Sequence, residues 1–263
     1  MDYLIIENDI NLIMEYDKIG VNIIFLDLEI LGKKQRQGHL NTVISENHSI
    51  DDVKKISSIL KNSKLLVRIN PINKNTKIEI DKCINDGADI LMLPMFKDAS
   101  EVKNFISLVD GRVRTCLLLE TKEAVNNLDT ILKISNIEEV YIGLNDLHLS
   151  LKMNFIFEPL SCGIVDSIVD KLNKKNIRFG FGGISTISGG KISGSMVLKE
   201  HLRLGSSMVI LSRDFKNLTK KNLQFFKNEF RRLKDSYKEY KNLSRDQLIK
   251  NHKNIVEKIL NIT

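Results

Sequence analysis

The chain alternates between two hydrophobic patterns. Short, continuously apolar runs of strand length recur, and each is followed by a stretch with the apolar spacing of an amphipathic helix. Continuous apolar runs are typical of parallel strands that are covered on both faces. The strand candidates lie at 3–7, 22–29, 64–70, 89–96, 113–121, 139–146, 177–183 and 207–212. The helix candidates lie near 8–19, 50–62, 76–87, 98–109, 121–134, 160–176 and 195–204.

Capping residues support these boundaries. Asp98 precedes one helix candidate and Thr121 precedes another, and both residue types accept hydrogen bonds from the first backbone N–H groups of a helix. Gly87 stands where a helix should end and a strand begin. The sequence therefore predicts eight consecutive strand–helix units.

Eight such units over about 215 residues match a (β/α)₈ TIM barrel in number and size. The alternative is an open, doubly wound sheet. No glycine-rich dinucleotide fingerprint follows the first strand, and a count of eight favours closure. We therefore predict one catalytic barrel domain over residues 1–215.

The remaining residues, 216–263, have a helical pattern without strands. Apolar residues follow at intervals of three and four in the order Leu223, Phe226, Phe230, Leu233, Tyr237, Tyr240, and then Ile249, His252, Val256, Ile259. Ser244 in "NLSRD" can cap a second helix. We predict a C-terminal extension of two amphipathic helices whose stripe is covered by the barrel or by another subunit. Because a barrel already has its own helices, we expect a homo-oligomer.

The net charge of +7 is located in this extension. Residues 216–263 contain thirteen Lys or Arg against five Asp or Glu, so the rest of the chain is close to neutral. A nucleic-acid-binding face would combine basic residues with aromatic or base-reading ones. The aromatic residues of the extension lie on its apolar stripe instead, so a solvated lysine-rich helix face is favoured over a nucleic-acid partner.

Three scattered cysteines, Cys83, Cys116 and Cys162, have no metal-binding spacing and do not indicate a disulfide framework. The acidic N-terminus "MDYLIIENDIN" is unlike a signal peptide. No apolar run reaches the roughly 18 residues of a membrane span. These features predict a cytoplasmic protein without a membrane partner.

Polar residues stand at the carboxyl ends of several predicted strands, where the side chains of a TIM barrel point into the active site. Four are carboxylates, Asp27, Glu29, Glu120 and Asp146, and one is a guanidinium, Arg68. Carboxylates that converge repel one another unless a proton or a cation intervenes. A divalent ion such as Mg²⁺ or Mn²⁺ prefers oxygen ligands, and Arg68 suits a carboxylate of the substrate.

Each of these residues also has a structural interpretation. Glu120 alone could cap the helix that begins near Thr121, Asp146 could form a local turn in a loop, and Arg68 could pair with a neighbouring helix. Taken together, at one end of one barrel, they favour an active site.

The histidines are weaker candidates for site residues. His148 is expected to point away from the site, and His39 and His48 fall in a long loop.

Six blocks of sequence, in order, resemble the HpcH/HpaI aldolase family and the citrate lyase β-subunit, in the phosphoenolpyruvate/pyruvate-domain superfamily. The blocks are "FLDLEILGK", "LLVRIN", "GADILMLPMF", "LLLET", "IGLND" and "EHLRLGSSMVILSR". The resemblance as a whole extends from about residue 3 to about residue 215, essentially the whole barrel. The set is specific for the superfamily and much less so for a substrate.

The resemblance implies a divalent-metal-dependent chemistry through a pyruvate enolate. It assigns Glu120 of "LLLET" and Asp146 of "GLND" as metal ligands, and Arg68 as the group that contacts the ketone oxygen. Backbone N–H groups at Asn145 and Asp146 would hold the substrate carboxylate. On this interpretation the strand ends on Asp146 because its carboxylate faces the metal ion.

One departure from the family affects the general base. Aldolases of the family have a histidine directly after the Asp-x-Glu of the second strand, and citrate-lyase-like members have an aspartate there, whereas this chain has Ile30. The remaining candidates are a water molecule steered by Glu29, or His39 or Lys33 of the loop that follows. Lys33 could also bind an anionic part of the substrate; a solvated loop is equally compatible with the sequence.

The sequence thus predicts a lyase that cleaves or forms a C–C bond between pyruvate and an aldehyde, with a 4-hydroxy-2-oxo acid as the joined compound. One alternative is a CoA-ester lyase of the citramalyl- or malyl-CoA type. Another is a barrel without turnover that serves as a binding or assembly subunit, which the missing histidine would allow.

Overall fold

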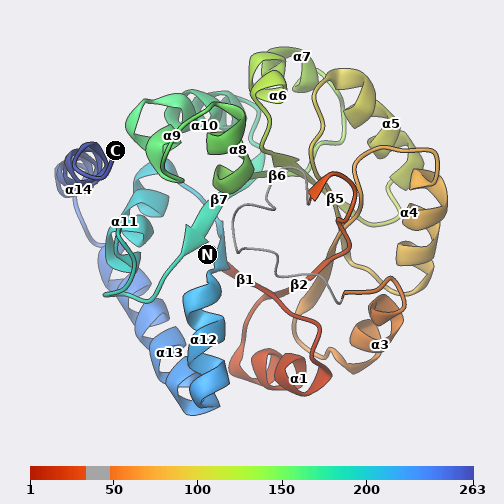
Figure 1. The fold of residues 1–263 in the computed structure, drawn as a ribbon, viewed down its shortest axis with the longest axis horizontal. Helices are drawn as coiled ribbons and strands as arrows, with labels where there is room; N and C mark the ends of the chain where they lie inside the picture. Colours follow the sequence, from red (N-terminus) through yellow and green to blue (C-terminus); the bar gives the residue numbers. More distant parts are fainter. Residues whose placement is uncertain (34–47) are drawn as a thin grey trace.

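The computed structural model describes residues 1–33 and 48–263. Eight parallel strands close into a barrel in their sequence order, and helices surround them (Figure 1). The strands are β1 (Asp2–Ile6), β2 (Ile23–Asp27), β3 (Lys64–Arg68), β4 (Ile90–Leu93), β5 (Arg114–Leu119), β6 (Glu139–Ile142), β7 (Arg178–Ile184) and β8 (Met208–Leu211). All eight predicted strands are present, and β1 pairs with β8, so the (β/α)₈ barrel is confirmed and the open sheet is excluded.

The helices between the strands follow the predicted pattern. They are α1 (Ile10–Ile19), α3 (Asp52–Ile59), α4 (Thr76–Asn85), α5 (Ala99–Val109), α6 (Lys122–Asn126), α7 (Leu128–Ile131), α8 (Leu144–Ser150), α9 (Glu158–Ser161), α10 (Ile164–Lys174) and α11 (Gly194–Leu204). Asp98 and Thr121 cap α5 and α6 with their side chains, as predicted. Gly87, after α4, has a φ of +99°, which glycine adopts without strain.

Two predicted helices are each divided in the structure. The segment 121–134 forms α6 and α7, which meet at Asn127, and the segment 160–176 forms α9 and α10, which are separated at Gly163. Helix α8 was not predicted, because its residues continue an apolar run that resembles a strand. A buried helix segment and a buried strand cannot be told apart by hydrophobic period alone.

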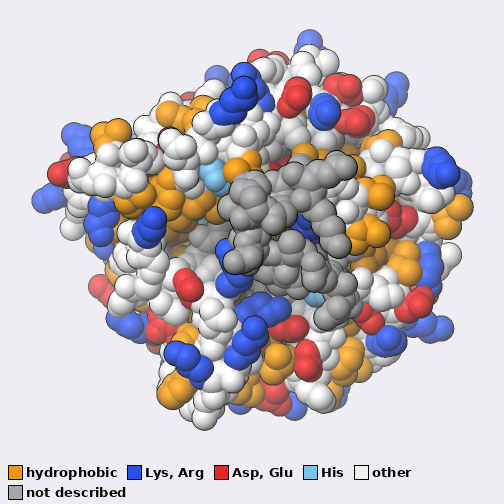
Figure 2. All heavy atoms as spheres, viewed as in Figure 1, with side chains coloured by type: hydrophobic (Ala, Val, Ile, Leu, Met, Phe, Trp, Pro, Cys, Tyr) orange, Lys and Arg blue, Asp and Glu red, His pale blue; other side chains and the backbone are white. Residues whose placement is uncertain are grey.

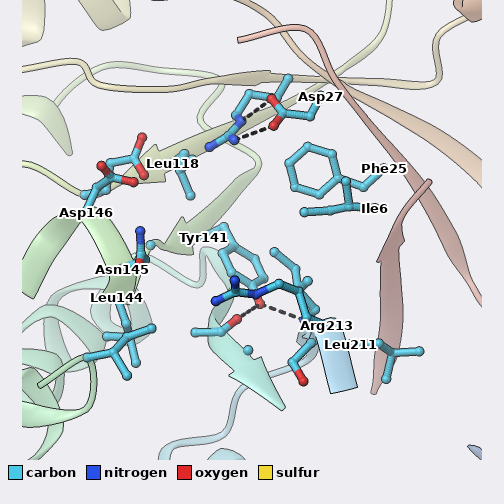
Figure 3. Close-up of a pocket in the computed structure, with 18 of the residues that line it drawn as sticks. Ile6, Phe25, Asp27, Leu118, Tyr141, Leu144, Asn145, Asp146, Leu211 and Arg213 are labelled. Atoms are coloured by element: carbon cyan, nitrogen blue, oxygen red, sulfur yellow. Dashed lines mark hydrogen bonds and ion pairs between the residues drawn. The ribbon is translucent and has the colours of Figure 1, made fainter. Parts of the chain in front are cut away.

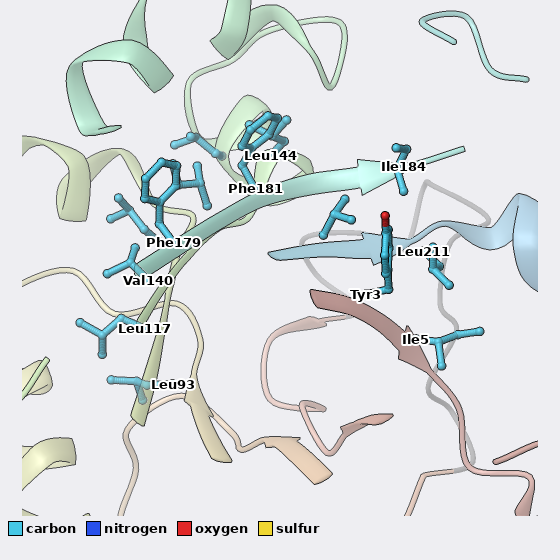
Figure 4. Packing of buried hydrophobic residues seen from close by; sticks show 14 of the residues in the cluster. Tyr3, Ile5, Leu93, Leu117, Val140, Leu144, Phe179, Phe181, Ile184 and Leu211 are labelled. Atoms are coloured by element: carbon cyan, nitrogen blue, oxygen red, sulfur yellow. The ribbon is translucent and has the colours of Figure 1, made fainter. Parts of the chain in front are cut away.

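The apolar residues form two layers, one on each side of the barrel wall. The inner layer comprises Leu4, Ile23, Phe25, Leu66, Ile90, Met92, Cys116, Leu118, Tyr141 and Met208. Residues of the opposite parity, such as Leu117 and Val140, point outward and pack beneath the helices (Figure 4). Burial on both faces explains why the strands are continuously apolar.

The C-terminal residues form α12 (Arg213–Lys221), α13 (Leu223–Tyr240) and α14 (Arg245–Leu260). On α13 the predicted stripe is buried against the body of the barrel: Phe226 packs on Tyr16 with ring centroids 4.7 Å apart, and Phe230 packs on Tyr3 at 5.2 Å. The chain itself therefore covers this stripe. The homo-oligomer, which was inferred from the stripe, stays a prediction.

Helix α14 begins as predicted and packs on α11. Ser244 and Gln247 form a reciprocal capping box at its start. Its buried face consists of Asn251, Ile255 and Ile259, whereas Ile249, which the predicted stripe included, is exposed. That part of the stripe was wrong because the polar Asn251 faces inward, where its amide donates to the Met196 carbonyl at 3.0 Å.

The boundary between barrel and extension stays a prediction. Helix α12 crosses the proposed boundary at residue 215 and contacts the barrel through the buried Phe215.

In residues 1–33 and 48–263, no helix is both long enough and apolar enough to cross a bilayer.

Candidate active site

A cavity of about 260 Å³ opens at the carboxyl ends of the strands (Figure 3). Six of the predicted site residues line it, namely Asp27, Lys33, Arg68, Glu120, Asn145 and Asp146. The fold therefore brings these predicted residues together around one cavity, although they come from four separate parts of the chain.

Strand alternation explains how three of the charged side chains reach the cavity. Phe25, Leu66 and Leu118 belong to the inner apolar layer. Residues two positions further along a strand face the same side. Asp27, Arg68 and Glu120 therefore continue the inward-facing rows at the point where the apolar core ends.

Asp146 reaches the cavity by a different route from the one predicted. Strand β6 ends at Ile142, and Asp146 lies in the first turn of α8 together with Asn145. The prediction that the sixth strand ends on this carboxylate was therefore wrong, but the side chain still lines the cavity and is largely buried. Figure 3 shows Asn145 and Asp146 on the same side of the cavity.

Glu120 is enclosed by the protein. Its Oε1 accepts a hydrogen bond from the Met95 backbone N–H at 3.2 Å. A Cβ atom at Gly143 would lie 2.8 Å from Glu120 Oε2, so glycine is needed there for the carboxylate to fit. The alternative that Glu120 caps α6 was wrong, because the Thr121 hydroxyl accepts from the Ala124 N–H.

The electrostatic environment of Glu120 is unusual for a carboxylate. Burial raises the pKa of Glu120 well above its usual range, and the nearby carboxylates of Asp146 and Glu29 raise it further. Arg68 opposes this rise without outweighing it. Two acidic side chains, one directly after β5 and one from the first turn of α8, thus share one cavity, where a proton or a cation between them is favoured.

Arg68 is held by Asp27, its direct neighbour on the adjacent strand. Nε and Nη2 of Arg68 donate to the two carboxylate oxygens of Asp27, each at 2.8 Å. Asp27 thus occupies the Nε–Nη2 edge of Arg68, and the predicted role of Arg68 in binding a substrate carboxylate stays a prediction. The alternative that Arg68 pairs with a neighbouring helix was wrong, because its partners are Asp27 on β2 and Glu29 just after it. Nη1 of Arg68 faces Glu29 at 3.3 Å.

Asp27 also binds Lys33. The ammonium group lies 2.6 Å from Asp27 Oδ2, and both side chains are buried. Burial alone would raise the pKa of Asp27, but the two cations outweigh it and hold the pKa well below its usual range. Asp27 is therefore a permanent anion that fixes the position of Arg68.

Among the described residues, Glu29 is not one of those that line the cavity, and its side chain is almost completely buried. Its contact with Arg68 places it behind the guanidinium, so any effect on a reaction would be exerted through Arg68.

His48 was expected to be a solvated loop residue, but it reaches the barrel rim. Its Nδ1 accepts a hydrogen bond from the Asp27 backbone N–H at 3.0 Å, and burial lowers its pKa. No local sequence pattern indicates this contact, because 21 positions separate the two residues. His39, the other loop candidate, lies outside the described residues.

Tyr141, Arg213 and Lys216 are among the cavity residues that were not predicted. Tyr141 donates from its hydroxyl to the Gly182 carbonyl at 2.5 Å and accepts from the Ile210 N–H at 2.8 Å, which ties β6 to β7 and β8. Arg213 and Lys216 line the cavity from the start of α12. Their place directly after the eighth strand was the available signal, since loops at this position form part of the site in this fold.

Within the part of the chain that the structure describes, no group of three or more His, Cys, Asp or Glu side chains is arranged to hold a metal ion. The acidic pair Glu120 and Asp146 supplies two carboxylate ligands from side chains. Mg²⁺ commonly takes one or two carboxylates and completes its shell with water and substrate, so the pair fits an ion of this kind.

Fold and site together define a (β/α)₈ barrel with a charged cavity at the carboxyl ends of its strands. Residues 47–155 match the family model described as HpcH/HpaI aldolase/citrate lyase, which confirms the resemblance indicated by the sequence motifs. The match to this family model supports a lyase-type enzyme activity. No curated protein sequence matches this chain.

Solved structures share the fold at low sequence identity. The HpcH/HpaI aldolase from Desulfitobacterium hafniense DCB-2 is 14% identical, with a TM-score of 0.65, over 86% of this chain and 92% of that one. An HpcH/HpaI aldolase/citrate lyase family protein from Burkholderia cenocepacia J2315 is 13% identical, with a TM-score of 0.65, over 84% and 91%. Citrate synthase SbnG is 14% identical, with a TM-score of 0.64, over 85% and 92%.

Proposed function

We propose that this protein is a divalent-metal-dependent lyase that forms or cleaves a C–C bond through the enolate of pyruvate. The compound cleaved is a 4-hydroxy-2-oxo acid, and the products are pyruvate and an aldehyde. The observation that carries the proposal is that Glu120 and Asp146 line one cavity together with the buried Arg68.

Glu120 and Asp146 would hold the metal ion, Mg²⁺ or Mn²⁺. Their chemistry suits it, because both donors are carboxylate oxygens and their mutual repulsion is relieved by a cation. When bound, such an ion acts as a Lewis acid that polarises the carbonyl group of the substrate.

Arg68 supplies a fixed positive charge to the same cavity. Burial alone would lower the pKa of Arg68, but Asp27 and Glu29 raise it well above its usual value, so the guanidinium stays protonated. A preorganised cation stabilises negative charge that develops on the ketone oxygen during reaction, without reorganising at that moment. In this proposal Asp27 is a positioning residue, since it orients Arg68 through two hydrogen bonds.

The backbone N–H groups of Asn145 and Asp146 would bind the carboxylate of pyruvate, as the resemblance to the family implies. Both residues lie in the first turn of α8, where N–H groups lack acceptors within the helix. Glu29 would act indirectly through Arg68, and Lys33 through Asp27, rather than by gripping the substrate itself.

Proton exchange at the methyl group of pyruvate tests this function without knowledge of the aldehyde. The exchange is followed by NMR in D₂O with Mg²⁺, with Mn²⁺ and with EDTA. We expect exchange that EDTA abolishes and that added metal restores. Exchange that persists in EDTA would remove the metal from the proposal, and no exchange with either metal would favour a barrel without turnover. Activity that requires a CoA thioester would instead favour the CoA-ester lyase.

A further inference from the structure

His48 contacts the barrel beside the charged cluster that lines the cavity. Its Nδ1 lies 3.0 Å from the backbone nitrogen of Asp27, the last residue of β2. The carboxylate of Asp27 accepts two hydrogen bonds from Arg68 (Figure 3) and also binds the ammonium group of Lys33. The imidazole thus holds the backbone of the residue that orients the guanidinium of the proposed site.

The direction of this hydrogen bond determines the state of the imidazole. A backbone N–H group can only donate, so Nδ1 of His48 must accept. A neutral imidazole has one acceptor nitrogen and one N–H group, whereas a protonated imidazole has two N–H groups and no acceptor. The contact with Asp27 therefore requires a neutral His48 that carries its proton on Nε2.

From this contact we propose that His48 is a positioning residue of the cavity. In its neutral form it holds the Asp27 backbone, and Asp27 holds Arg68 in the orientation that stabilises negative charge on the ketone oxygen. Protonation of His48 breaks the first of these contacts and loosens the second. The inference rests on the proposed function and deepens it, because it gives the reaction a pH dependence that does not come from the acidic pair.

Charges of both signs act on the imidazole. Figure 2 shows Lys and Arg side chains interspersed with Asp and Glu side chains between α12 and α1. The main ionisable groups that act on the imidazole are Glu7 after β1, Asp27 on β2, Asp52 on α3 and Lys216 on α12. Glu7 Oε2 lies 3.3 Å from the ammonium group of Lys216, and Asp52 Oδ1 lies 3.0 Å from that of Lys55. Since Asp27 is held by two cations, each of these carboxylates already has a cation of its own.

Burial therefore decides the state of the imidazole. It lowers the pKa of His48 from the usual value of 6.5, and the paired carboxylates do not reverse this shift. Because the pKa is lowered, His48 is neutral at pH 7, and the contact with Asp27 is lost as the pH falls through the lowered pKa. The pH dependence that His48 gives to the site should accordingly lie on the acid side of 6.5.

The first test measures proton exchange at the pyruvate methyl group in the Mg²⁺-loaded protein between about pH 5 and pH 8. H48N keeps an acceptor, because Oδ1 of asparagine stands at the same position along the side chain as Nδ1 of histidine, and its amide does not titrate. H48A removes the acceptor. The ratio of wild-type to H48N rates cancels pH effects that the two proteins share, such as the binding of the metal ion.

We expect this ratio to stay near one above pH 6.5 and to fall by up to about tenfold as His48 becomes protonated. H48A should be about tenfold slower than H48N at every pH. H252N is the matched control, because His252 is a half-buried histidine that binds Glu200 and lies outside the cavity lining. It should follow the wild-type protein throughout. A wild-type to H48N ratio that stays constant while His48 titrates would overturn the inference.

NMR of the ring nitrogens follows the titration of His48 without any turnover. We expect the neutral ring to carry its proton on Nε2, and the signals of the Asp27 amide and of Arg68 Nε–H to shift with the midpoint of the ring. Spectra of H48N and R68K assign the ring and the guanidinium. A proton on Nδ1 of the neutral ring, or signals that do not follow His48, would contradict the positioning role. Absence of pyruvate exchange in the wild-type protein would contradict the proposed function, and these signals would still decide the role of His48.

Discussion

The two ends of the barrel contain buried charges in opposite arrangements. At the amino end, Glu139 at the start of β6 is bonded to Arg178, and to Arg114 at 3.1 Å, while Arg178 also binds Asp2 at 2.5 Å. At the carboxyl end, the buried carboxylates of Glu120 and Asp146 share one cavity. At the amino end every one of these charges is paired with an opposite one, whereas the carboxyl end contains the paired cluster of Asp27, Arg68 and Lys33 and, beside it, two like charges in one cavity.

This difference separates a charge cluster that stabilises the fold from the cluster that forms the proposed site. Paired charges satisfy one another and close the amino end of the barrel. Like charges in a cavity raise the pKa of one member and cost stability, and such costs are concentrated at functional sites. Replacing the acid at the amino end should therefore lower stability and leave activity largely unchanged. Replacing an acid of the pair at the carboxyl end should lower activity without lowering stability.

The largest effect is expected at the acidic pair. E120Q and D146N should each reduce metal-dependent pyruvate exchange by at least about a thousandfold, or about 4 kcal/mol in activation free energy, because each loses a charged oxygen donor. E120Q should leave thermal stability unchanged or raise it, since a like charge is removed. E123Q, at an exposed position on α6, is the control. Near-normal exchange in both site variants would contradict the assigned roles.

A smaller loss is expected from R68K. Lysine replaces a planar group that makes two hydrogen bonds to Asp27 with a single ammonium, so the charge is kept but its orientation is lost. We expect exchange to fall by about 10- to 100-fold. R112K, which alters an exposed arginine paired with Asp81, should retain full exchange. An R68K protein with normal exchange would show that the fork geometry is unimportant.

At the amino end, E139Q should destabilise the protein by about 1–2 kcal/mol while pyruvate exchange stays within twofold of normal. The variant leaves Arg114 and Arg178 without their shared carboxylate, and the cost is smaller than for a fully buried pair because both arginines are partly exposed. Urea unfolding measures the change. A loss of exchange without a loss of stability would reverse the distinction between the two ends.

His201, in the outer layer behind β7, offers a pH-dependent comparison. Burial lowers its pKa to about 3, and its ring stacks on Phe181. Between pH 6.5 and 3 the unfolded chain binds a proton that the folded protein rejects, so stability falls as pH falls, by up to about 1.4 kcal/mol per pH unit. H201Q should lack this contribution. Urea unfolding from pH 7 to pH 4.5 measures it, and parallel curves for both proteins would contradict the assignment.

The smallest effect is expected in the C-terminal extension. S244A removes the side-chain acceptor of the capping box at the start of α14, which should lower the free energy of unfolding by about 1 kcal/mol. Exchange should be unchanged, because α14 packs on α11 and does not line the cavity. A large loss of exchange would instead indicate that the extension supports the site.

The sequence by itself determined the barrel and much of its acidic end. Eight apolar runs, each followed by a helical pattern, predicted the closed sheet, because local hydrophobic period reports the burial of each element. Side chains two positions apart on a strand face the same side. Because Phe25, Leu66 and Leu118 face inward, so do Asp27, Arg68 and Glu120, two positions further along. The buried stripe of α13 and the Ser244 cap follow from the same local rules.

Only the tertiary structure decided which charges meet. The register of β2 against β3 sets Arg68 beside Asp27, Lys33 folds back onto the same carboxylate, and His48 returns to the rim from a distant position. Arg213 and Lys216 line the same cavity as the acidic pair only because the barrel closes between β8 and β1. Such contacts depend on strand register and closure, which join residues far apart in the chain and leave no periodic trace in it.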